Sequence, residues 1–381
     1  MSSLYDHISA SRRLDSLTAS RLTDLARAAA GEAKLEVASW DVEPVHGGFG
    51  SAVGGTSLYR FKIRTASKET ISLVLKILYE RRGEEARSPY YWKREYEIYR
   101  SSILAELPAN SFSTPRIFDL QDFGDSCWIW MEDIEDIKGA WTLSDFGDIA
   151  QRLGRFNGAW MTAKPLPDFD WLTANWHSAI VPALAPAFHD LDSLLESPLA
   201  RTALPYKAKD EIAAIWNDRH LFQKALRQLP RALCHTDAFR RNILRRKHDV
   251  ALLDWALASI GGIGEELVCL VAVSLYYEGF SAEFADQLDK TVFAGYIEGL
   301  RQAGWAGDAK LARIGYTCAM VLRGLAGVKQ DLELLEDEAN YELLFRTHHT
   351  TNLTEIARLF ADVRSFRLLK MAREASRLLS A

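Results

Sequence analysis

The spacing of apolar and polar positions changes near residue 140 of this chain. Between residues 35 and 132, apolar and polar positions alternate or form short apolar runs, as in Ser57–Arg64 and Ile71–Leu78, which is typical of strands. Tyr91–Leu104 is the exception in this region, because its apolar positions have helical spacing. From about residue 141 the spacing is mainly helical, most clearly in Leu143–Trp160. The pattern predicts an α+β protein with a larger, mostly helical C-terminal part.

Four segments are predicted from these changes of spacing. Residues 1–34 form a leading helical segment, with Ser16–Ala30 as its best helix. Residues 35–132 form an N-terminal domain of strands and one main helix. Residues 133–140 form a linker, and residues 141–381 form the C-terminal domain. The chain contains no internal repeat and no low-complexity tract.

Composition excludes several classes of protein. The chain has 381 residues, 48% of them hydrophobic and 25% charged, which is ordinary for a globular enzyme. A net charge of −5 argues against nucleic acid as the main partner. No uninterrupted apolar run approaches the roughly 20 residues of a membrane helix, and Met1–Asp15 lacks the apolar core of a signal peptide. The four cysteines have no CxxC spacing, which predicts buried free thiols and a cytoplasmic location.

The most specific motif lies in the C-terminal domain. His235–Asn242 has the pattern H-x-D-x-x-x-x-N, and Asp254 follows the apolar run Val250–Leu253. Phosphoryl transfer needs a carboxylate near the attacking hydroxyl, and an amide and a second carboxylate that hold Mg²⁺ against the phosphates. Apolar stretches on both sides of residues 245–249 predict a hairpin that returns Asp254 to the loop. Each residue alone has an ordinary explanation as a cap, turn or strand end, but their order and spacing favour function.

Two upstream features fit the same chemistry. A glycine-rich segment, His46–Thr56, lies between two predicted strands, where backbone N–H groups can approach phosphates because no Cβ intervenes. Lys76 lies inside an apolar strand, where an unpaired charge is costly. Its predicted partner is Glu95 on the following helix, with Glu97 as the competitor. The alternatives are a flexible hairpin loop and an edge-strand lysine that faces water.

In their order, these pieces resemble the aminoglycoside phosphotransferase and choline kinase-like family of small-molecule kinases. The resemblance spans roughly residues 35–270 and rests on Gly47-Gly48, Lys76, Glu95, Trp130-Met131-Glu132-Asp133, the His235–Asn242 pattern and Asp254-Trp255. It implies a two-lobed, protein-kinase-like fold with an antiparallel sheet in the small N-terminal lobe, and an ATP-dependent phosphotransferase that uses Mg²⁺. The implied acceptor is a hydroxyl of a small molecule, such as an aminoglycoside-like antibiotic, an amino alcohol or a sugar-type metabolite.

The resemblance also implies a role for each matching residue. Asp237 is the catalytic base, and His235 braces its loop by hydrogen bonding. Asn242 and Asp254 bind Mg²⁺. The implied nucleotide-binding residues are Lys76, its orienting partner Glu95 and the phosphate-loop residues Gly47, Gly48, Gly50 and Ser51. Met131, Glu132 and Ile134, where the N-terminal domain meets the linker, complete the set. A second pair, Gly54-Gly55, leaves open which glycines cover the phosphates.

Two segments depart from the family pattern. Gly264-Glu265-Glu266-Leu267 stands where an Asp-Leu pair is common, and Asn157 stands near the place of a typical histidine. Arg240 and Arg241 either face the γ-phosphate or face solvent. The alternative function is a nucleotide-binding regulatory pseudokinase without turnover. Such a protein would lack the lysine, the base or a metal ligand, and all of these residues are present, which favours the enzyme.

Overall fold

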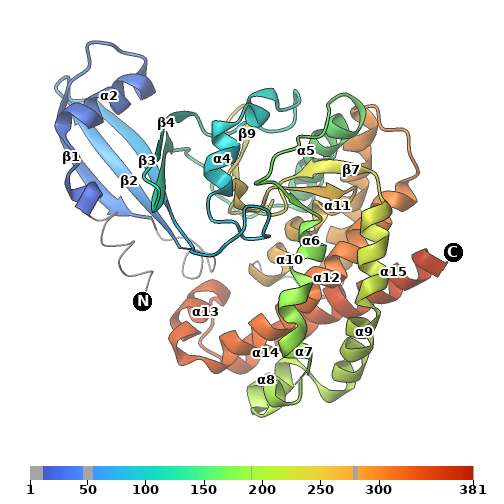
Figure 1. Cartoon of the computed structure of the whole chain (residues 1–381). Helices are drawn as coiled ribbons and strands as arrows, with labels where there is room; N and C mark the ends of the chain where they lie inside the picture. Colours follow the sequence, from blue (N-terminus) through green and yellow to red (C-terminus); the bar gives the residue numbers. More distant parts are fainter. Residues whose placement is uncertain (1–11, 46–54, 190, 278–281, 381) are drawn as a thin grey trace. The chain divides into compact units, whose positions relative to one another are not determined.

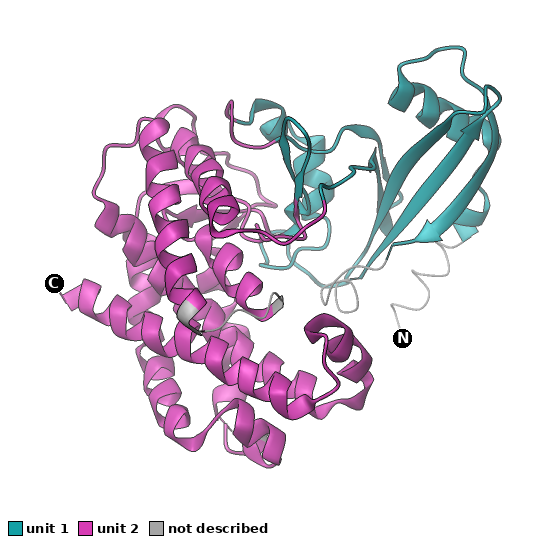
Figure 2. Cartoon of the chain, turned by 180° about the vertical axis from the view of Figure 1, so that it is seen from behind, with its two compact units in different colours: residues 1–107, 113–137, 244–256 teal, residues 108–112, 138–243, 257–381 magenta. Residues whose placement is uncertain are grey.

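The computed structural model describes residues 12–45, 55–189, 191–277 and 282–380, and its chain forms two compact units (Figure 2). Unit 1 comprises residues 1–107, 113–137 and 244–256, and unit 2 comprises residues 108–112, 138–243 and 257–381. The segment 244–256, which follows the catalytic-loop motif directly, therefore belongs to unit 1. The four segments proposed from the sequence remain predictions.

A five-stranded antiparallel sheet with the order β1-β2-β3-β5-β4 forms the centre of unit 1 (Figure 1). Its strands are β1 (Val37–Pro44), β2 (Thr56–Thr65), β3 (Thr70–Tyr79), β4 (Ile117–Asp122) and β5 (Ser126–Glu132). Together with the helical unit 2, this sheet confirms the predicted α+β fold. The helix predicted over Tyr91–Leu104 is shorter than expected, because α4 (Arg94–Arg100) ends at Ser101 and a separate 3₁₀ turn follows.

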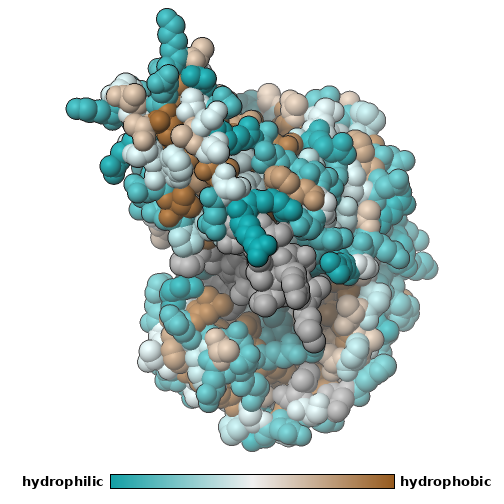
Figure 3. Space-filling view, turned by 60° about the vertical axis from the view of Figure 1, so that its left-hand side comes forward, coloured by the Kyte–Doolittle hydropathy of each residue, from teal (hydrophilic) through white to brown (hydrophobic). Residues whose placement is uncertain are grey.

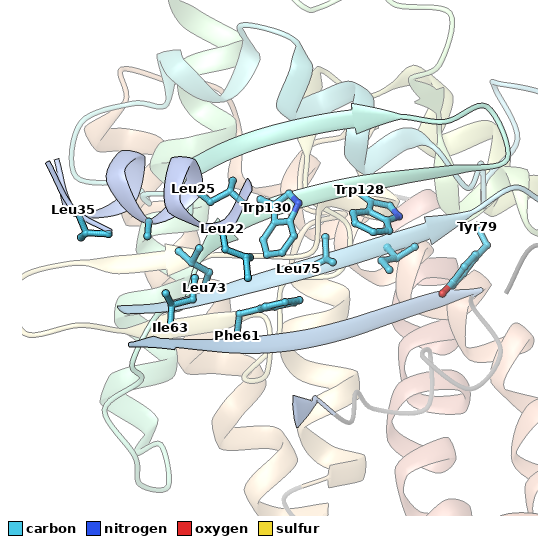
Figure 4. Packing of buried hydrophobic residues seen from close by; sticks show 12 residues of the cluster. Leu22, Leu25, Leu35, Phe61, Ile63, Leu73, Leu75, Tyr79, Trp128 and Trp130 are labelled. Atoms are coloured by element: carbon cyan, nitrogen blue, oxygen red, sulfur yellow. The ribbon is translucent and has the colours of Figure 1, made fainter. Parts of the chain in front are cut away.

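Alternation along the strands gives the sheet two buried faces. On one face, Phe61, Leu75 and Trp130 pack with Leu22 and Leu25 of α2 (Ala19–Ala30), as Figure 4 shows. Helix α2 begins at Thr18, whose side chain accepts a hydrogen bond from the backbone N–H of Arg21.

The other face of the sheet packs with α4. Val74 and Leu78 of β3 and Ile129 of β5 form a cluster with Tyr96 of α4. Residues two apart on a strand point to the same face. Lys76 lies between Val74 and Leu78 in β3, so its side chain is directed to the α4 face.

Unit 2 is mostly helical. Its helices are α5 (Leu143–Thr162), α6 (Trp176–Ala179), α7 (Ala185–His189), α8 (Pro198–Ala203), α9 (Tyr206–Gln228), α10 (Leu267–Tyr277), α11 (Ala282–Gln302), α12 (Ala309–Glu336), α13 (Tyr341–His348), α14 (Leu353–Arg364) and α15 (Met371–Ser380). A small sheet with the order β6-β10-β7 contains β6 (Thr173–Ala174), β7 (Arg231–Cys234) and β10 (Ser259–Gly262). The predicted hairpin over residues 243–253, nearly all of which belongs to unit 1, is formed by β8 (Ile243–Arg245) and β9 (Val250–Leu252).

Helix α12 is the core helix of unit 2. Among the described residues it is the one helix long and apolar enough to cross a membrane, but 72% of its apolar window is buried inside the protein. Burial against protein explains its composition.

The described large apolar side chains that are exposed are Val42, Tyr90, Phe123, Ile137, Leu166, Phe169, Tyr206, Leu221 and Leu379. The face drawn in Figure 3 is mainly hydrophilic, with its apolar residues in small groups.

Glycines bring α5 and α11 into close backbone contact. A Cβ built on Gly154 lies 2.2 Å from the carbonyl oxygen of Tyr296, and one built on Gly299 lies 1.9 Å from that of Gln151. These distances are too short for any side chain, so the two helices approach this closely only with glycine at both positions. The approach positions Asn157, one turn after Gly154, to accept a 2.7 Å hydrogen bond from the hydroxyl of Tyr296.

We expect Gly299→Ala to destabilise the protein, although alanine normally favours a helix over glycine by about 1 kcal/mol. The added Cβ meets backbone rather than a movable side chain, which overpacks the interface and costs about 3 kcal/mol. Gly147→Ala in the same helix pair is the control, because its Cβ meets only the Cγ2 of Thr291, at 3.2 Å. Urea denaturation followed by circular dichroism measures both. Equal effects of the two substitutions would contradict this packing.

Candidate active site

Lys76 is buried in unit 1 between two carboxylates. Its Nζ lies 2.5 Å from Oε2 of Glu95 and donates a 3.0 Å hydrogen bond to Oδ1 of Asp254. Burial by itself would lower the pKa of Lys76, but the carboxylates of Asp254 and Glu95 outweigh it and raise the pKa. The ammonium therefore stays charged. Glu95 is the partner predicted from the sequence, whereas the competitor Glu97 contacts Lys93 and Arg100 instead.

This triad has more negative than positive charge. One ammonium serves two carboxylates, and Glu95 is 1% exposed. Burial, followed by the nearby Asp254 carboxylate, raises the pKa of Glu95 to about 7 against the attraction of Lys76. Asp254 keeps 42% of its side chain exposed. A cation at Asp254 would balance the excess charge, which fits its predicted role as a metal ligand.

Asp254 also has an unusual backbone conformation. Its φ is +62°, in the left-handed region that residues other than glycine rarely adopt. The conformation is held by the next residues, because Trp255 is fully buried and the carbonyl of Ala256 accepts a 2.9 Å hydrogen bond from Arg94. Backbone strain of this kind persists where surrounding contacts enforce it, and it is common at functional sites.

The predicted nucleotide linker is held in place by ion pairs within unit 1. Asp133 accepts hydrogen bonds from Nε of Arg60 at 2.7 Å and from the hydroxyl of Ser72 at 2.6 Å. The side chain of Glu132 accepts a 3.1 Å hydrogen bond from Arg246. These carboxylates are engaged within the protein, which leaves the linker backbone as the part suited to a ligand. Met131, at 5% exposure, is the last buried residue of β5, which ends at Glu132, and Ile134 follows in the linker. The predicted phosphate-loop residues Gly47, Gly48, Gly50 and Ser51 lie outside the described residues.

The catalytic-loop residues lie together at the end of β7 in unit 2. The amide nitrogen of Asn242 donates to the carbonyl of Asp237 at 2.9 Å and to its Oδ2 at 3.1 Å. The backbone N–H of Asp237 donates to Nδ1 of His235 at 3.3 Å. His235 is fully buried, and its hydrogen bond to the backbone of Asp237 stabilises the conformation of the loop. Because the Asn242 nitrogen points to Asp237, its Oδ1 is the atom suited to a cation.

Glu266 anchors this loop, a role that the sequence did not reveal. Its Oε2 accepts a 2.7 Å hydrogen bond from the backbone N–H of His235, and its Oε1 accepts a 3.1 Å bond from that of Thr236. Thr236 has a φ of +70°, and its hydroxyl lies 2.9 Å from that of Ser259. A fully buried carboxylate thus stabilises a strained turn directly before Asp237.

A hydrogen-bond network connects Glu266 to the helices of unit 2. Asn157 of α5 donates to the carbonyl of Leu233 at 2.8 Å and to Glu266 at 3.4 Å. The adjacent Glu265 accepts a 2.6 Å hydrogen bond from the backbone of Gly262 and lies 2.8 Å from Nδ1 of His177. The two departures from the family pattern therefore lie in one network beneath the catalytic loop. In the sequence, the sign of this network was the pair of consecutive glutamates directly before an apolar helix.

Two further side chains contact Asp237. Nη2 of Arg323, on α12, donates to Oδ1 of Asp237 at 3.3 Å. Sγ of Cys269, on α10, lies 3.4 Å from the same oxygen. Neither residue has a motif or spacing that indicates this contact. Arg240, whose direction the sequence left open, donates to the carbonyl of Ile243 at 3.2 Å, and Arg241 is exposed.

Asn242 and Asp254, the predicted metal ligands, carry oxygen atoms of the kind that Mg²⁺ binds. Within the described ranges, no group of three or more His, Cys, Asp or Glu side chains is arranged to hold a metal. Mg²⁺ in phosphate-binding sites usually takes one or two protein ligands and completes its shell with phosphates and water. In unit 2 the carbonyl oxygen of Asn242 is a ligand of this kind, and in unit 1 the carboxylate of Asp254 is another.

We expect Glu266→Gln to lower the free energy of unfolding by about 2 kcal/mol, because glutamine supplies one acceptor oxygen for two backbone N–H groups. Burial raises the pKa of Glu266 from 4.5 to about 7. Between these values the folded protein binds a proton that the unfolded chain does not, so wild-type stability falls as pH rises. The loss caused by Glu266→Gln should therefore be larger at pH 5 than at pH 8.

Urea denaturation at both pH values measures this difference. Glu298→Gln is the matched control, because Glu298 is exposed on α11. A loss that is the same at pH 5 and pH 8 would show that Glu266 does not titrate between them.

Comparison with known proteins gives a family and a fold. The model of a family described as a phosphotransferase enzyme family (APH) matches residues 52–307, more than half of the chain. No curated protein matches the sequence. A spectinomycin phosphotransferase, solved in complex with ADP and spectinomycin, is 15% identical with a TM-score of 0.53, and the match covers 91% of this chain and 99% of that one. An amicoumacin kinase, solved in complex with AMP-PNP and Ca²⁺, is 13% identical with a TM-score of 0.51 and coverages of 83% and 87%.

Proposed function

Because the chain belongs to the phosphotransferase enzyme family, an ATP-using family of small-molecule kinases, we propose that it transfers the γ-phosphate of ATP to a hydroxyl of a small molecule. The main support is the loop in which Asp237, Asn242 and His235 contact one another. The triad of Lys76, Glu95 and Asp254 adds to it. The two sets supply the groups that phosphoryl transfer requires.

In the proposed mechanism, Asp237 orients the acceptor hydroxyl and takes its proton. The hydroxyl oxygen forms a bond to the γ-phosphorus, and the bond between this phosphorus and the bridging oxygen breaks, with the electron pair leaving on ADP. Mg²⁺ bound by Asn242 and Asp254 would neutralise phosphate charge. Positioning and electrostatics supply most of the barrier reduction in this chemistry.

The remaining predicted residues bind the nucleotide in this proposal. Lys76 contacts the phosphates, and Glu95 keeps its ammonium in place. Gly47, Gly48, Gly50 and Ser51 cover the phosphates with backbone N–H groups. The backbone of the linker residues Met131, Glu132 and Ile134 binds the adenine edge. The linker ion pairs described above support this assignment, because they hold that backbone in one conformation.

The acceptor class is a proposal from likeness. The spectinomycin and amicoumacin kinases have the same fold, and we propose a hydroxylated antibiotic, an amino alcohol or a sugar-type metabolite for this chain. The four cysteines are free and buried, which supports a reducing compartment such as the cytoplasm. The alternative function, a regulatory pseudokinase, requires that ATP binds without turnover.

We expect Asp237→Ala to lower the rate of ADP release by about 10²–10⁴-fold, because it removes the proposed base. An acceptor screen coupled to ADP detection measures the rate, and mass spectrometry identifies the phosphorylated product. Asp218→Ala on α9 removes an exposed carboxylate of the same unit and serves as the control. Near-normal turnover in the purified Asp237 variant would exclude the proposed role.

We expect ATP with Mg²⁺ to raise the melting temperature of the wild-type protein more than ATP with EDTA. Asn242→Ala should remove the added effect of Mg²⁺ and keep most of the effect of ATP, whereas Lys76→Ala should weaken both, because it removes the phosphate contact and leaves Glu95 unpaired. Differential scanning fluorimetry measures the shifts. Stabilisation by ATP without ADP formation across the acceptor screen would favour the regulatory pseudokinase instead.

A further inference from the structure

Both carboxylate oxygens of Asp237 are engaged within unit 2. Oδ2 accepts from Asn242 at 3.1 Å, and Oδ1 accepts from Arg323 at 3.3 Å. The side chains of Arg323 and Asp237 are only 19% and 20% exposed, respectively. An ion pair this shielded from solvent is stronger than one on the surface. An acceptor hydroxyl that uses Oδ1 has to compete with the guanidinium of Arg323.

Arg323 is fixed to the same structure as the catalytic loop. Helix α12 packs directly on the turn that precedes Glu266. A Cβ built on Gly315 would lie 1.9 Å from the carbonyl oxygen of Ile263, and one built on Gly264 would lie 2.0 Å from that of Ala312. The guanidinium of Arg323 also lies over the ring of Trp176, 5.0 Å from its centroid. The position of Arg323 relative to Asp237 is therefore set by close backbone contact and not by a flexible loop.

The other ionisable groups near this ion pair have hydrogen-bond partners of their own within unit 2. Glu265 accepts a hydrogen bond from the backbone of Gly262 and is bonded to His177, whose pKa is lowered by burial, so the neutral imidazole does not cancel the charge of the glutamate. Burial also raises the pKa of Cys269 far above its ordinary value, so its thiol is neutral. Further along α12, Asp331 is already paired with Arg364 at 2.8 Å. An acceptor that approaches Asp237 meets the guanidinium of Arg323, which is paired with it and which attracts anions and repels cations.

We propose that Arg323 is a specificity-determining residue of the acceptor site. It pairs with Asp237 in the free enzyme and binds a carboxylate or phosphate group of the acceptor during transfer. The anion draws the guanidinium away from Oδ1, which then accepts the hydrogen bond of the reacting hydroxyl. In the absence of an acceptor, the same ion pair keeps Asp237 from activating water. This inference rests on the proposed phosphotransferase function.

The first test needs no acceptor. We expect Arg323→Gln to raise the basal rate of ATP hydrolysis by about tenfold, because it removes a charged hydrogen bond to Asp237. Arg323→Lys, which keeps the charge, should stay closer to the wild-type rate. Lys329→Gln removes an exposed positive charge from the same helix and should leave the basal rate unchanged. A basal rate in Arg323→Gln equal to or below that of wild type overturns the proposal.

The second test measures the preference for charge. Two acceptor series of matched shape are compared: glucuronate, glucose and glucosamine, and glycolate, ethylene glycol and ethanolamine. We expect the anionic member to stimulate ADP release most in the wild type. Arg323→Gln should raise KM for that member by about tenfold or more and change kcat less. A wild-type preference for the cationic members, or no stimulation by either anion, overturns the proposal.

The two levels of the hypothesis fail in different ways. If ATP neither stabilises the wild-type protein nor is hydrolysed by it, the phosphotransferase function itself is excluded. If the wild-type protein binds ATP and phosphorylates an acceptor, but Arg323→Gln retains its basal rate and its charge preference, only the role of Arg323 is excluded.

Discussion

Glu266 has no access to solvent, and its two carboxylate oxygens accept hydrogen bonds from the backbone of His235 and Thr236. These bonds hold Thr236 in the left-handed conformation that turns the chain into Asp237. A buried carboxylate is costly unless such donors surround it. The geometry of the catalytic loop therefore depends on a residue outside the loop motif, which the chain supplies from the turn before α10.

The same constraint acts on Lys76 in unit 1. A lysine in the interior of a sheet needs a carboxylate on the face to which it points, and the alternation of β3 directs it to α4. Glu95 supplies that carboxylate and Asp254 supplies a second. A group with two carboxylates and one ammonium can accept a further cation, which supports the proposed role of Asp254 as a ligand of Mg²⁺.

Arg323 is a feature that the family fold alone would not predict. The chain shares its fold with the spectinomycin and amicoumacin kinases, and within it a guanidinium from α12 engages an oxygen of Asp237, the proposed base. Acceptor specificity in such a fold is decided by the few side chains next to the base, because the scaffold stays the same. Under the proposed function, the charge of Arg323 therefore indicates which acceptors the site binds, whereas the similarity of the fold does not.

The sequence by itself determined the α+β class, the antiparallel N-terminal sheet and the pairing of Lys76 with Glu95. The class follows from local spacing, because the period of two in strands and of 3.6 in helices is set by backbone geometry. The antiparallel arrangement was implied by the family resemblance, and the pairing followed from the cost of burying an unpaired lysine. The contacts of Glu266, Asn157 and Arg323 were decided only by the tertiary structure. Arg323 lies 86 residues from Asp237, and an arginine in a long helix has no local pattern that indicates its partner. Close backbone packing at Gly264 and Gly315 holds α12 against the turn before Glu266, and such packing depends on how distant segments meet.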